Sequence, residues 1–317
     1  ICGTSLESGA DLPGFPAETS ATPGVAWRVA MAATPLPPPC GELVYTAGHE
    51  AADAVEVWRP RPGALHLVFG DGTAALVDAD ARAIQVAWPA GQDFDDALTY
   101  LVGPVLGAAL RLQGREVLHA SCVEVDGRAV AVLGPAGAGK STLTAALIDA
   151  GMPLVTEDVC ALCFGDDDAA PPAVFRGGTR VKLWEDSAAA LRGATDALPR
   201  LVPSSKDWHK RFLDAAARTV ARDLTPLGAV FVLDRRADVV TPVVEELVGP
   251  ERLLSLIANA YAGSLLDAAG RARQLERLGA VAAAVPVRRL LFPDRFDALP
   301  ATVAALLANV RGAKVAR

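Results

Sequence analysis

The feature that most constrains the fold is a glycine-rich loop, Gly134-Pro135-Ala136-Gly137-Ala138-Gly139-Lys140-Ser141. An apolar run at 129–133 precedes this loop, and an apolar helical pattern at 142–150 follows it. The spacing matches G-x-x-x-x-G-K-[ST], in which glycines turn backbone N–H groups toward phosphate oxygens and the next helix adds its positive N-terminal end. The sequence therefore predicts a strand, a phosphate-binding loop and a helix in succession.

The loop predicts binding of a nucleoside triphosphate, ATP by preference, together with Mg²⁺. The backbone from Gly134 to Thr142 is expected to surround the phosphates. Lys140 is expected to reach the β- and γ-phosphates, and the Ser141 hydroxyl to bind Mg²⁺. The alternative is a glycine-rich turn that only resembles the motif, which the flanking strand and helix patterns disfavour.

A tight hairpin is predicted just before the loop. Two apolar runs, 117–125 and 128–133, are separated only by Asp126-Gly127, and Asp-Gly between such runs is a strong hairpin signal. The register of this hairpin places His119 opposite Gly134, at the mouth of the loop. We predict that His119 contacts the γ-phosphate or the incoming nucleophile; the alternative is a structural histidine with satisfied hydrogen bonds.

Two adjacent carboxylates interrupt the next apolar run, which extends from Leu154 to Val159. Buried acids are costly unless a metal or a cation pairs with them, so Glu157 and Asp158 are site candidates. In phosphoryl transfer one carboxylate helps hold Mg²⁺ and another accepts the hydroxyl proton. We predict Glu157 and Asp158 as metal partners with Ser141, and Asp158 as the catalytic carboxylate. A strand end emerging into solvent is the alternative.

Basic groups are concentrated in the segment from Ser204 to Phe212. Such a segment can neutralise charge on the γ-phosphate, with Lys210 or Arg211 as the donor, or it can be a solvated helix start. The run from Thr179 to Trp184 alternates polar and apolar residues, as a half-buried strand does. Its basic side could face substrate, but we expect it to face solvent.

Two further motifs receive less weight. The strand Phe231-Val232-Leu233-Asp234 ends in an acid, as metal-linked strands of many phosphate-loop proteins do, but Glu157 and Asp158 already fill that role. Cys160 and Cys163 have zinc or redox spacing, yet no second pair completes four ligands. Strand alternation places these cysteines on opposite faces, so we predict core packing for them.

The rest of the chain predicts two globular parts. Short apolar runs between Glu42 and Trp88 are separated by turn residues and indicate an antiparallel meander. An apolar helix follows at 93–113, bent or broken near Gly103-Pro104. Its apolar stretch, Ala97 to Leu112, is about sixteen residues long, shorter than the roughly 20 that cross a membrane. Beyond residue 114, helical and strand patterns mix as in an α/β domain. The helical patterns lie at 141–150, 250–278 and 295–311, and the strand patterns at 153–164, 228–234 and 285–292.

These patterns divide the chain into an irregular segment 1–24, a smaller N-terminal antiparallel β-rich domain 25–113 that ends in a helix, and an ATP-binding domain 114–317. A net charge of −7 without a long basic run disfavours nucleic acid and anionic membranes as partners. Five cysteines form no obvious disulfide framework, and no signal peptide is visible. We therefore expect a cytoplasmic protein.

Together these segments resemble the HPr kinase/phosphorylase superfamily, and more narrowly the HPr-kinase-like proteins found with ribosomally made peptides such as lasso peptides. The resemblance is carried by Leu118-His119-Ala120-Ser121, Asp126-Gly127, Gly134 to Thr142 and Leu154 to Leu162. It is specific over 115–165 and looser to about 300. It implies an α/β fold, with a phosphate-loop kinase domain of phosphoenolpyruvate-carboxykinase-like architecture in which these segments assemble one ATP site.

The resemblance assigns functional roles to His119, Lys140, Ser141, Glu157 and Asp158. Glu157 stands where the bifunctional enzymes usually have Asp, and their Glu-x-Arg-Gly signature is not found between 165 and 230. Phosphorolysis, and HPr as a substrate, are therefore not expected. The resemblance implies a kinase that phosphorylates a hydroxyl, by preference a serine of a peptide or protein. One alternative is a kinase for a small serine-like molecule, and another is a nucleotide-gated peptide-binding module that transfers no phosphate. The oligomeric state is left open, with a homo-oligomer as one possibility.

Overall fold

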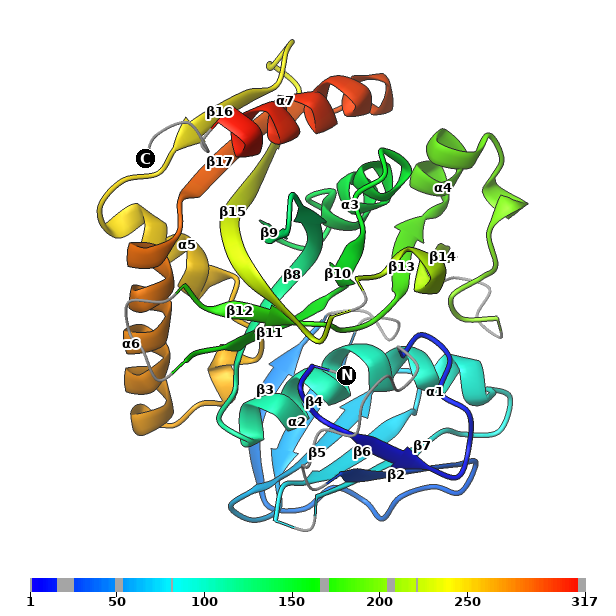
Figure 1. The fold of residues 1–317 in the computed structure, drawn as a ribbon. Coiled ribbons are helices and arrows are strands. Elements are labelled where there is room, and N and C mark those ends of the chain that lie inside the picture. The colour runs from blue at the N-terminus through cyan, green and yellow to red at the C-terminus, as the bar shows by residue number, and fades with distance from the viewer. Residues whose placement is uncertain are drawn as a thin grey trace.

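The chain folds into two β-sheet layers with helices between and around them, a mixed α/β architecture (Figure 1). This computed structural model describes residues 2–15, 26–48, 54–80, 82–165, 171–203, 209–220 and 222–312. The strands of the first sheet lie between residues 6 and 87, and those of the second between residues 116 and 293. Within the described residues, no helix is both long enough and apolar enough to cross a membrane.

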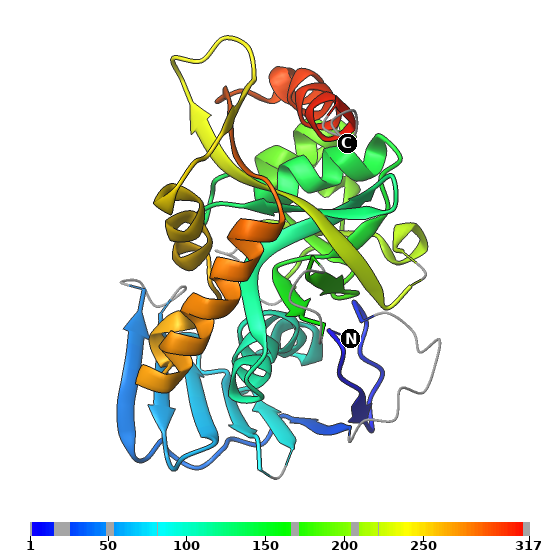
Figure 2. The same cartoon turned by 60° about the vertical axis from the view of Figure 1, so that its left-hand side comes forward.

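The first sheet has seven strands in the order β1-β2-β7-β6-β5-β4-β3 and forms the lower layer in Figure 2. Its strands are β1 (Leu6–Ser8), β2 (Trp27–Ala32), β3 (Glu42–Ala47), β4 (Val55–Arg59), β5 (Ala64–Phe69), β6 (Ala74–Asp78) and β7 (Ala83–Ala87). Strands β3 to β7 pair antiparallel in sequence order, which confirms the predicted meander.

Segment 1–24, which the sequence predicts to be irregular, contains strand β1. The prediction is wrong for these three residues. This strand pairs in parallel with β2, and β2 pairs in parallel with β7. The strand is only three residues long and has no internal alternation to read, so its structure comes from the backbone hydrogen bonds that β2 offers.

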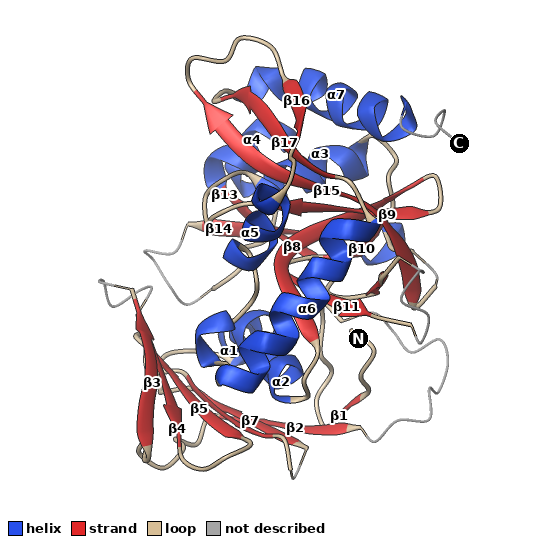
Figure 3. Ribbon diagram, turned by 90° about the vertical axis from the view of Figure 1, so that its left-hand side faces the viewer, coloured by secondary structure: helices blue, strands red, loops and turns tan. Residues whose placement is uncertain are grey.

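An apolar helical layer covers one face of this sheet (Figure 3). It consists of α1 (Phe94–Tyr100), the π-helical turn η1 (Leu101–Val105) and α2 (Leu106–Leu112). Asp93 and Asp96 form a capping box at its start. Pro104 lies inside the π-turn, where its missing N–H and its ring prevent a regular α-helix. The predicted irregularity near Gly103-Pro104 is therefore confirmed, and the helical chain continues through it.

The second sheet has the strand order β10-β8-β11-β12-β15-β17-β16, with β9 between β8 and β15. Its strands are β8 (Glu116–Val125), β9 (Arg128–Leu133), β10 (Leu154–Thr156), β11 (Val159–Cys163), β12 (Ala173–Phe175), β15 (Leu224–Arg236), β16 (Val243–Glu246) and β17 (Val287–Pro293). A separate two-stranded ribbon consists of β13 (Arg180–Trp184) and β14 (Lys210–Asp214).

The hairpin between β8 and β9 has the predicted register. Val125 pairs with Arg128, and Ala120 pairs with Leu133 at the other end of the ladder. Asp126 and Gly127 both have positive φ, 49° and 82°, as a tight two-residue hairpin requires. His119 and Gly134 are the next residues along each strand, so the hairpin brings the histidine to the start of the glycine-rich loop.

Helices cover the second sheet. They are α3 (Lys140–Asp149), α4 (Glu185–Arg192), α5 (Pro250–Ala258), α6 (Ala268–Ala284) and α7 (Leu299–Gly312), with short 3₁₀ turns η2 (Thr195–Ala197), η3 (Ala216–Arg218), η4 (Gly263–Leu265) and η5 (Phe296–Ala298). The single helix expected over 250–278 is wrong, because the chain leaves helical geometry between α5 and α6. There Tyr261 donates its backbone N–H to Val117 of β8 instead of continuing the helix.

Candidate functional site

The glycine-rich loop connects β9 to α3, as the sequence predicts. Gly134 has a φ of 152°, and a Cβ there would lie 2.9 Å from the Ala138 methyl group. Gly139 has a φ of 97° and directly precedes the helix. Both glycines adopt backbone conformations that a side chain disfavours, which allows the chain to turn tightly at the N-terminus of α3.

The side chain of Lys140 lies over its own loop. Its Nζ donates to the carbonyl oxygens of Gly134, at 2.7 Å, and of Pro135, at 3.2 Å. Burial lowers the pKa of Lys140, while the nearby carboxylates of Asp158 and Glu157 act in the opposite direction. The ammonium group is therefore held within the loop, at the place where phosphate oxygens are expected.

Ser141 and Glu157 are in direct contact. The Ser141 hydroxyl donates to Oε1 of Glu157 at 2.6 Å. Glu157 is almost fully buried, and its Oε2 has no hydrogen-bond partner among the described residues. Burial raises the pKa of Glu157, and the nearby Ser121 and Ser141 hydroxyls oppose this rise. A buried carboxylate with one unsatisfied oxygen beside a serine hydroxyl is suited to a hard divalent cation.

This donor set fits Mg²⁺ bound together with nucleotide phosphates. Within the described residues no group of three or more His, Cys, Asp or Glu side chains could hold a metal ion by itself. Mg²⁺ in phosphoryl-transfer sites needs only one or two protein oxygen ligands, since phosphates and water complete its shell. Ser141 and Glu157 supply such a pair.

Asp158 lies at a break between two strands. Strand β10 ends at Thr156 and β11 begins at Val159, and Asp158 has a left-handed backbone with a φ of 68°. Few residues with a Cβ adopt this conformation, and Asp is among those that tolerate it. Because of this break, neither Glu157 nor Asp158 belongs to a strand.

Two side chains, His119 and Lys182, contact the Asp158 carboxylate. His119 Nε2 lies 3.1 Å from Oδ1, and Lys182 Nζ donates to Oδ2 at 2.8 Å. Burial acts to raise the pKa of Asp158, but Lys182 and His119 outweigh it and hold the pKa well below its usual range. Asp158 is therefore ionised at neutral pH, and His119 is at the mouth of the loop as predicted.

Lys182 is a site residue that the sequence did not identify. Strand β13 was expected to turn its basic side to solvent, and this is wrong because the Lys182 side chain is only 15% exposed and pairs with Asp158. Arg180, on the same face, lies over the ring of Phe212. Alternation showed that one face of this strand is basic, but it did not show whether that face meets solvent or another element.

The structure separates the two predicted basic donors, Lys210 and Arg211. Lys210 lies over the Trp184 ring at 4.6 Å, and burial, with the charge of Lys182, lowers its pKa. Its strand pairs with the strand that carries Lys182, and the charges of Asp158 and Glu157 oppose the lowering of the Lys210 pKa. Arg211 instead binds the Glu185 carboxylate through Nε and Nη2, on the other side of the strand. Residues 204–208 lie outside the described part of the chain.

One wall of the site comes from the helical layer of the first sheet. A Cβ at Gly103, in the π-turn, would lie 3.0 Å from Asp158 Oδ2 and 3.1 Å from Lys182 Nζ. The helix backbone therefore packs against the ion pair at a position where a side chain would press on both groups. π-turns often occur at functional sites.

The remaining predicted residues lie around this cluster. Thr142, the last predicted nucleotide contact, shares a hydrogen bond with Ser187 of α4 at 2.9 Å. Asp234 instead pairs with Arg236 on its own strand. Cys160 is buried in the core, as predicted, and Cys163 is half-buried.

A solved structure titled "Structure of the Hpr(Ser) kinase/phosphatase from Coxiella burnetii" is similar to this chain. The two are 15% identical, the alignment covers 62% of this chain and 91% of that chain, and the TM-score is 0.34. No family model matches the chain, and no curated protein matches it significantly.

Proposed function

We propose that this protein is an ATP-dependent kinase that transfers the γ-phosphate to a hydroxyl group. The observation that carries the proposal is the convergence of three parts on one end of α3. These parts are the glycine-rich loop with Lys140, the Ser141–Glu157 contact, and Asp158 held between His119 and Lys182. Phosphoryl transfer requires positioning and charge stabilisation, and these parts supply both.

The two carboxylates have different proposed roles. Glu157 contacts Ser141, so these two residues would hold Mg²⁺ on the nucleotide side. The ion would neutralise negative charge on the phosphates. Asp158 instead contacts His119 and Lys182, so it is proposed to serve the acceptor side. This assignment separates roles that the sequence left open between the two acids.

In the proposed reaction, the acceptor oxygen forms a bond to the γ-phosphorus as the bond from that phosphorus to the β,γ-bridging oxygen breaks, releasing ADP. The hydroxyl proton passes to the ionised Asp158, which His119 and Lys182 hold in place. Lys140 neutralises charge on the phosphates. Lys210, whose charge is felt within the cluster, is proposed to stabilise the transferring group.

The finer assignments rest on the sequence resemblance. We propose the HPr-kinase-like architecture for the second sheet, and a serine of a peptide or protein as the acceptor. A small serine-like molecule is the alternative acceptor. Glu157 and Asp158 contact different partners, and this difference supports a kinase over a module that only binds nucleotide. A module that only binds nucleotide needs no second carboxylate to receive the proton of an acceptor hydroxyl.

A transfer assay with matched variants tests the proposal. Purified protein is incubated with γ-labelled ATP, Mg²⁺ and either a mixture of synthetic single-serine peptides or free serine. We expect Asp158→Asn to bind ATP with nearly unchanged affinity but to lower the transfer rate about 10²- to 10⁴-fold, as loss of a catalytic base does. Lys140→Ala is expected to weaken ATP binding itself.

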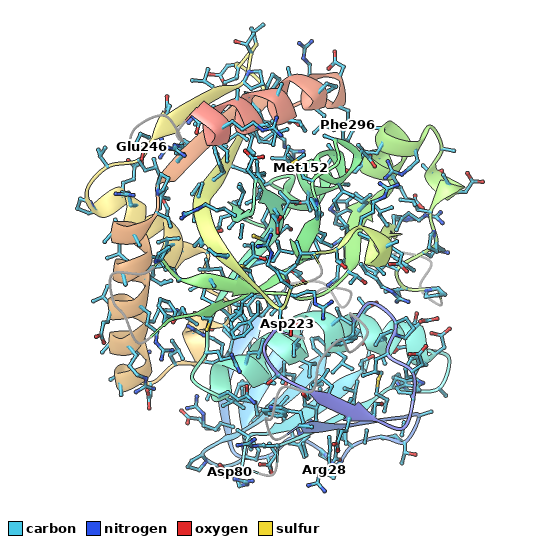
Figure 4. All side chains as sticks on the ribbon, viewed as in Figure 1. Arg28, Asp80, Met152, Asp223, Glu246 and Phe296 are labelled. Carbon is cyan, nitrogen blue, oxygen red and sulfur yellow. The ribbon has the colours of Figure 1, made fainter. Side chains whose placement is uncertain are left out.

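Asp80→Asn is the matched control. Asp80 lies at the lower edge of the molecule in Figure 4, its side chain is 69% exposed, and it pairs with Arg61. This variant is expected to retain full transfer. Labelled phosphate on a peptide identifies a peptide or protein acceptor. Labelled phosphate on free serine identifies a small-molecule acceptor. Full transfer by the Asp158→Asn protein would remove Asp158 from the mechanism, and the absence of calorimetric heat with MgATP would end the proposal.

A further inference from the structure

A short turn between α5 and α6 touches three parts of the site, although it belongs to no motif. Residues 259–261 run antiparallel beside the start of β8, and Ala260 forms a bridge with Leu118. His119 donates its backbone N–H to the Asn259 carbonyl at 2.8 Å, and Tyr261 donates to the Val117 carbonyl at 2.8 Å. The turn is thus fixed to the strand that carries His119.

The side chain of Asn259 reaches the glycine-rich loop. Its Oδ1 accepts a hydrogen bond from the backbone N–H of Gly134 at 3.0 Å, while its Nδ2 donates to the Ser255 carbonyl at 2.8 Å. The second bond fixes the amide so that its oxygen faces Gly134. One residue therefore holds the first amide of the loop through its side chain and the His119 backbone through its carbonyl oxygen.

Tyr261 contacts the histidine ring itself. The two ring centroids are 5.7 Å apart at an interplanar angle of 72°, an edge-to-face arrangement. On its other side the Tyr261 ring lies against helix α2, where a Cβ at Gly107 would be 2.3 Å from Cε1. The imidazole therefore contacts both the Tyr261 ring and the Asp158 carboxylate, while 39% of the His119 side chain stays exposed.

The backbone of the turn is strained. Ala262, directly after Tyr261, has a left-handed conformation with φ 49° and ψ 32°. Asp158, whose carboxylate contacts His119, also has a left-handed backbone, which Asp tolerates better than Ala. Residues with a Cβ adopt this conformation at a cost, and they retain it where surrounding contacts impose it.

We propose that Asn259 and Tyr261 are positioning residues for phosphoryl transfer. Asn259 sets the start of the glycine-rich loop relative to His119, and Tyr261 holds the His119 imidazole against Asp158. The proposal deepens the proposed kinase function and rests on it. It predicts that Asn259 affects the affinity for nucleotide and that Tyr261 affects the rate of phosphate transfer.

Steady-state kinetics and calorimetry test these two effects. With MgATP and the single-serine peptide mixture, ADP release gives kcat, and calorimetry gives the Kd for MgATP. Asn259→Ala removes one hydrogen bond to the loop, so we expect the Kd to rise about 5- to 10-fold with a much smaller change in kcat. Tyr261→Ala is expected to lower kcat about 10-fold with the Kd nearly unchanged, whereas Tyr261→Phe, which keeps the ring, restores most of kcat.

Two variants serve as controls. Asn309→Ala removes an amide on α7 whose Oδ1 has no hydrogen-bond partner among the described residues, and Tyr45→Ala removes a partly exposed ring on β3. Both are expected to leave kcat and Kd unchanged. If Asn259→Ala and Tyr261→Ala also leave both constants unchanged, the positioning roles are wrong.

Amide hydrogen exchange separates failure of this proposal from failure of the kinase function. Asn259→Ala is expected to speed exchange in segments covering 130–143, with no change in the first sheet, whether or not the protein transfers phosphate. If the unmodified protein neither binds ATP nor transfers phosphate, the kinase function fails, and exchange still decides whether Asn259 holds the loop. Unchanged exchange in 130–143 overturns the role of Asn259.

Discussion

Asp158 pairs with the Lys182 ammonium group and contacts His119 at a position where its side chain is only 20% exposed. Ion pairs on the surface stabilise little, but a carboxylate left largely buried without its cation is costly. The Asp158–Lys182 pair is therefore expected to contribute to stability as well as to the proposed chemistry.

A double-mutant cycle tests this contribution. Lys182→Met is expected to lower the free energy of unfolding by about 1–3 kcal/mol, because it leaves Asp158 with His119 alone. Adding Asp158→Asn to Lys182→Met is expected to recover part of that loss, since no charge then remains unpaired. Urea unfolding of the four proteins measures the coupling, and strictly additive effects would mean that the pair is not coupled.

Among individual residues, the sequence predicted the site residues that lie within a motif. It missed the site residues that lie on other segments of the chain and contact the motif only in the folded protein. Lys140, Ser141 and Glu157 converge as expected, because a fixed spacing and a hairpin bring them together locally. Asn259 and Tyr261 gave no signal, since they reach the site through contacts between residues more than 100 positions apart.

Among helices and strands as well, local features were predicted and features set by distant contacts were missed. The β8–β9 hairpin was predicted with its register because Asp126-Gly127 fixes the turn. The break between α5 and α6 was not predicted, because the helical pattern of 250–278 continues through it while a hydrogen bond to β8 overrides that pattern. Local propensity is a weak guide where another element competes for the same backbone groups.

Two glycines on different helices give a matched test of element packing. In α2, a Cβ at Gly107 would collide with the Tyr261 ring, whereas nothing lies within 4 Å of a Cβ at Gly279 in α6. Gly107→Ala is expected to destabilise the protein by about 1–3 kcal/mol through overpacking. Gly279→Ala is expected to stabilise it by about 0.5–1 kcal/mol, as alanine does inside a helix. Urea unfolding compares them, and a stabilising Gly107→Ala would refute the close contact between α2 and the turn.

Across the whole molecule, the two sheets share packed side chains. A junction cluster joins α2 to β8 and β11, and its buried members are Cys2, Leu106, Leu110, Val117, Val159 and Ala161. Thr99 of α1 also donates to the Leu201 carbonyl at 3.1 Å. These contacts are expected to make the two layers unfold together.

Tryptophan fluorescence tests this coupling. Trp27 and Trp88 are buried in the core of the first sheet, far along the chain from the glycine-rich loop. MgATP at 100 times its Kd is expected to stabilise the protein by about 2.7 kcal/mol. The thermal midpoint followed by fluorescence should rise together with the midpoint followed by circular dichroism. A fluorescence midpoint that does not move would show that the first sheet unfolds independently.

The break after β10 has a consequence for how such a protein can diversify. Consecutive Cα atoms are about 3.8 Å apart, and within that one step the Glu157 side chain meets Ser141 while the Asp158 side chain meets His119 and Lys182. Under the proposed function, neighbouring residues would therefore serve the two reactants. The surface around Asp158 would then be free to change its acceptor over evolution while the proposed nucleotide site stays the same.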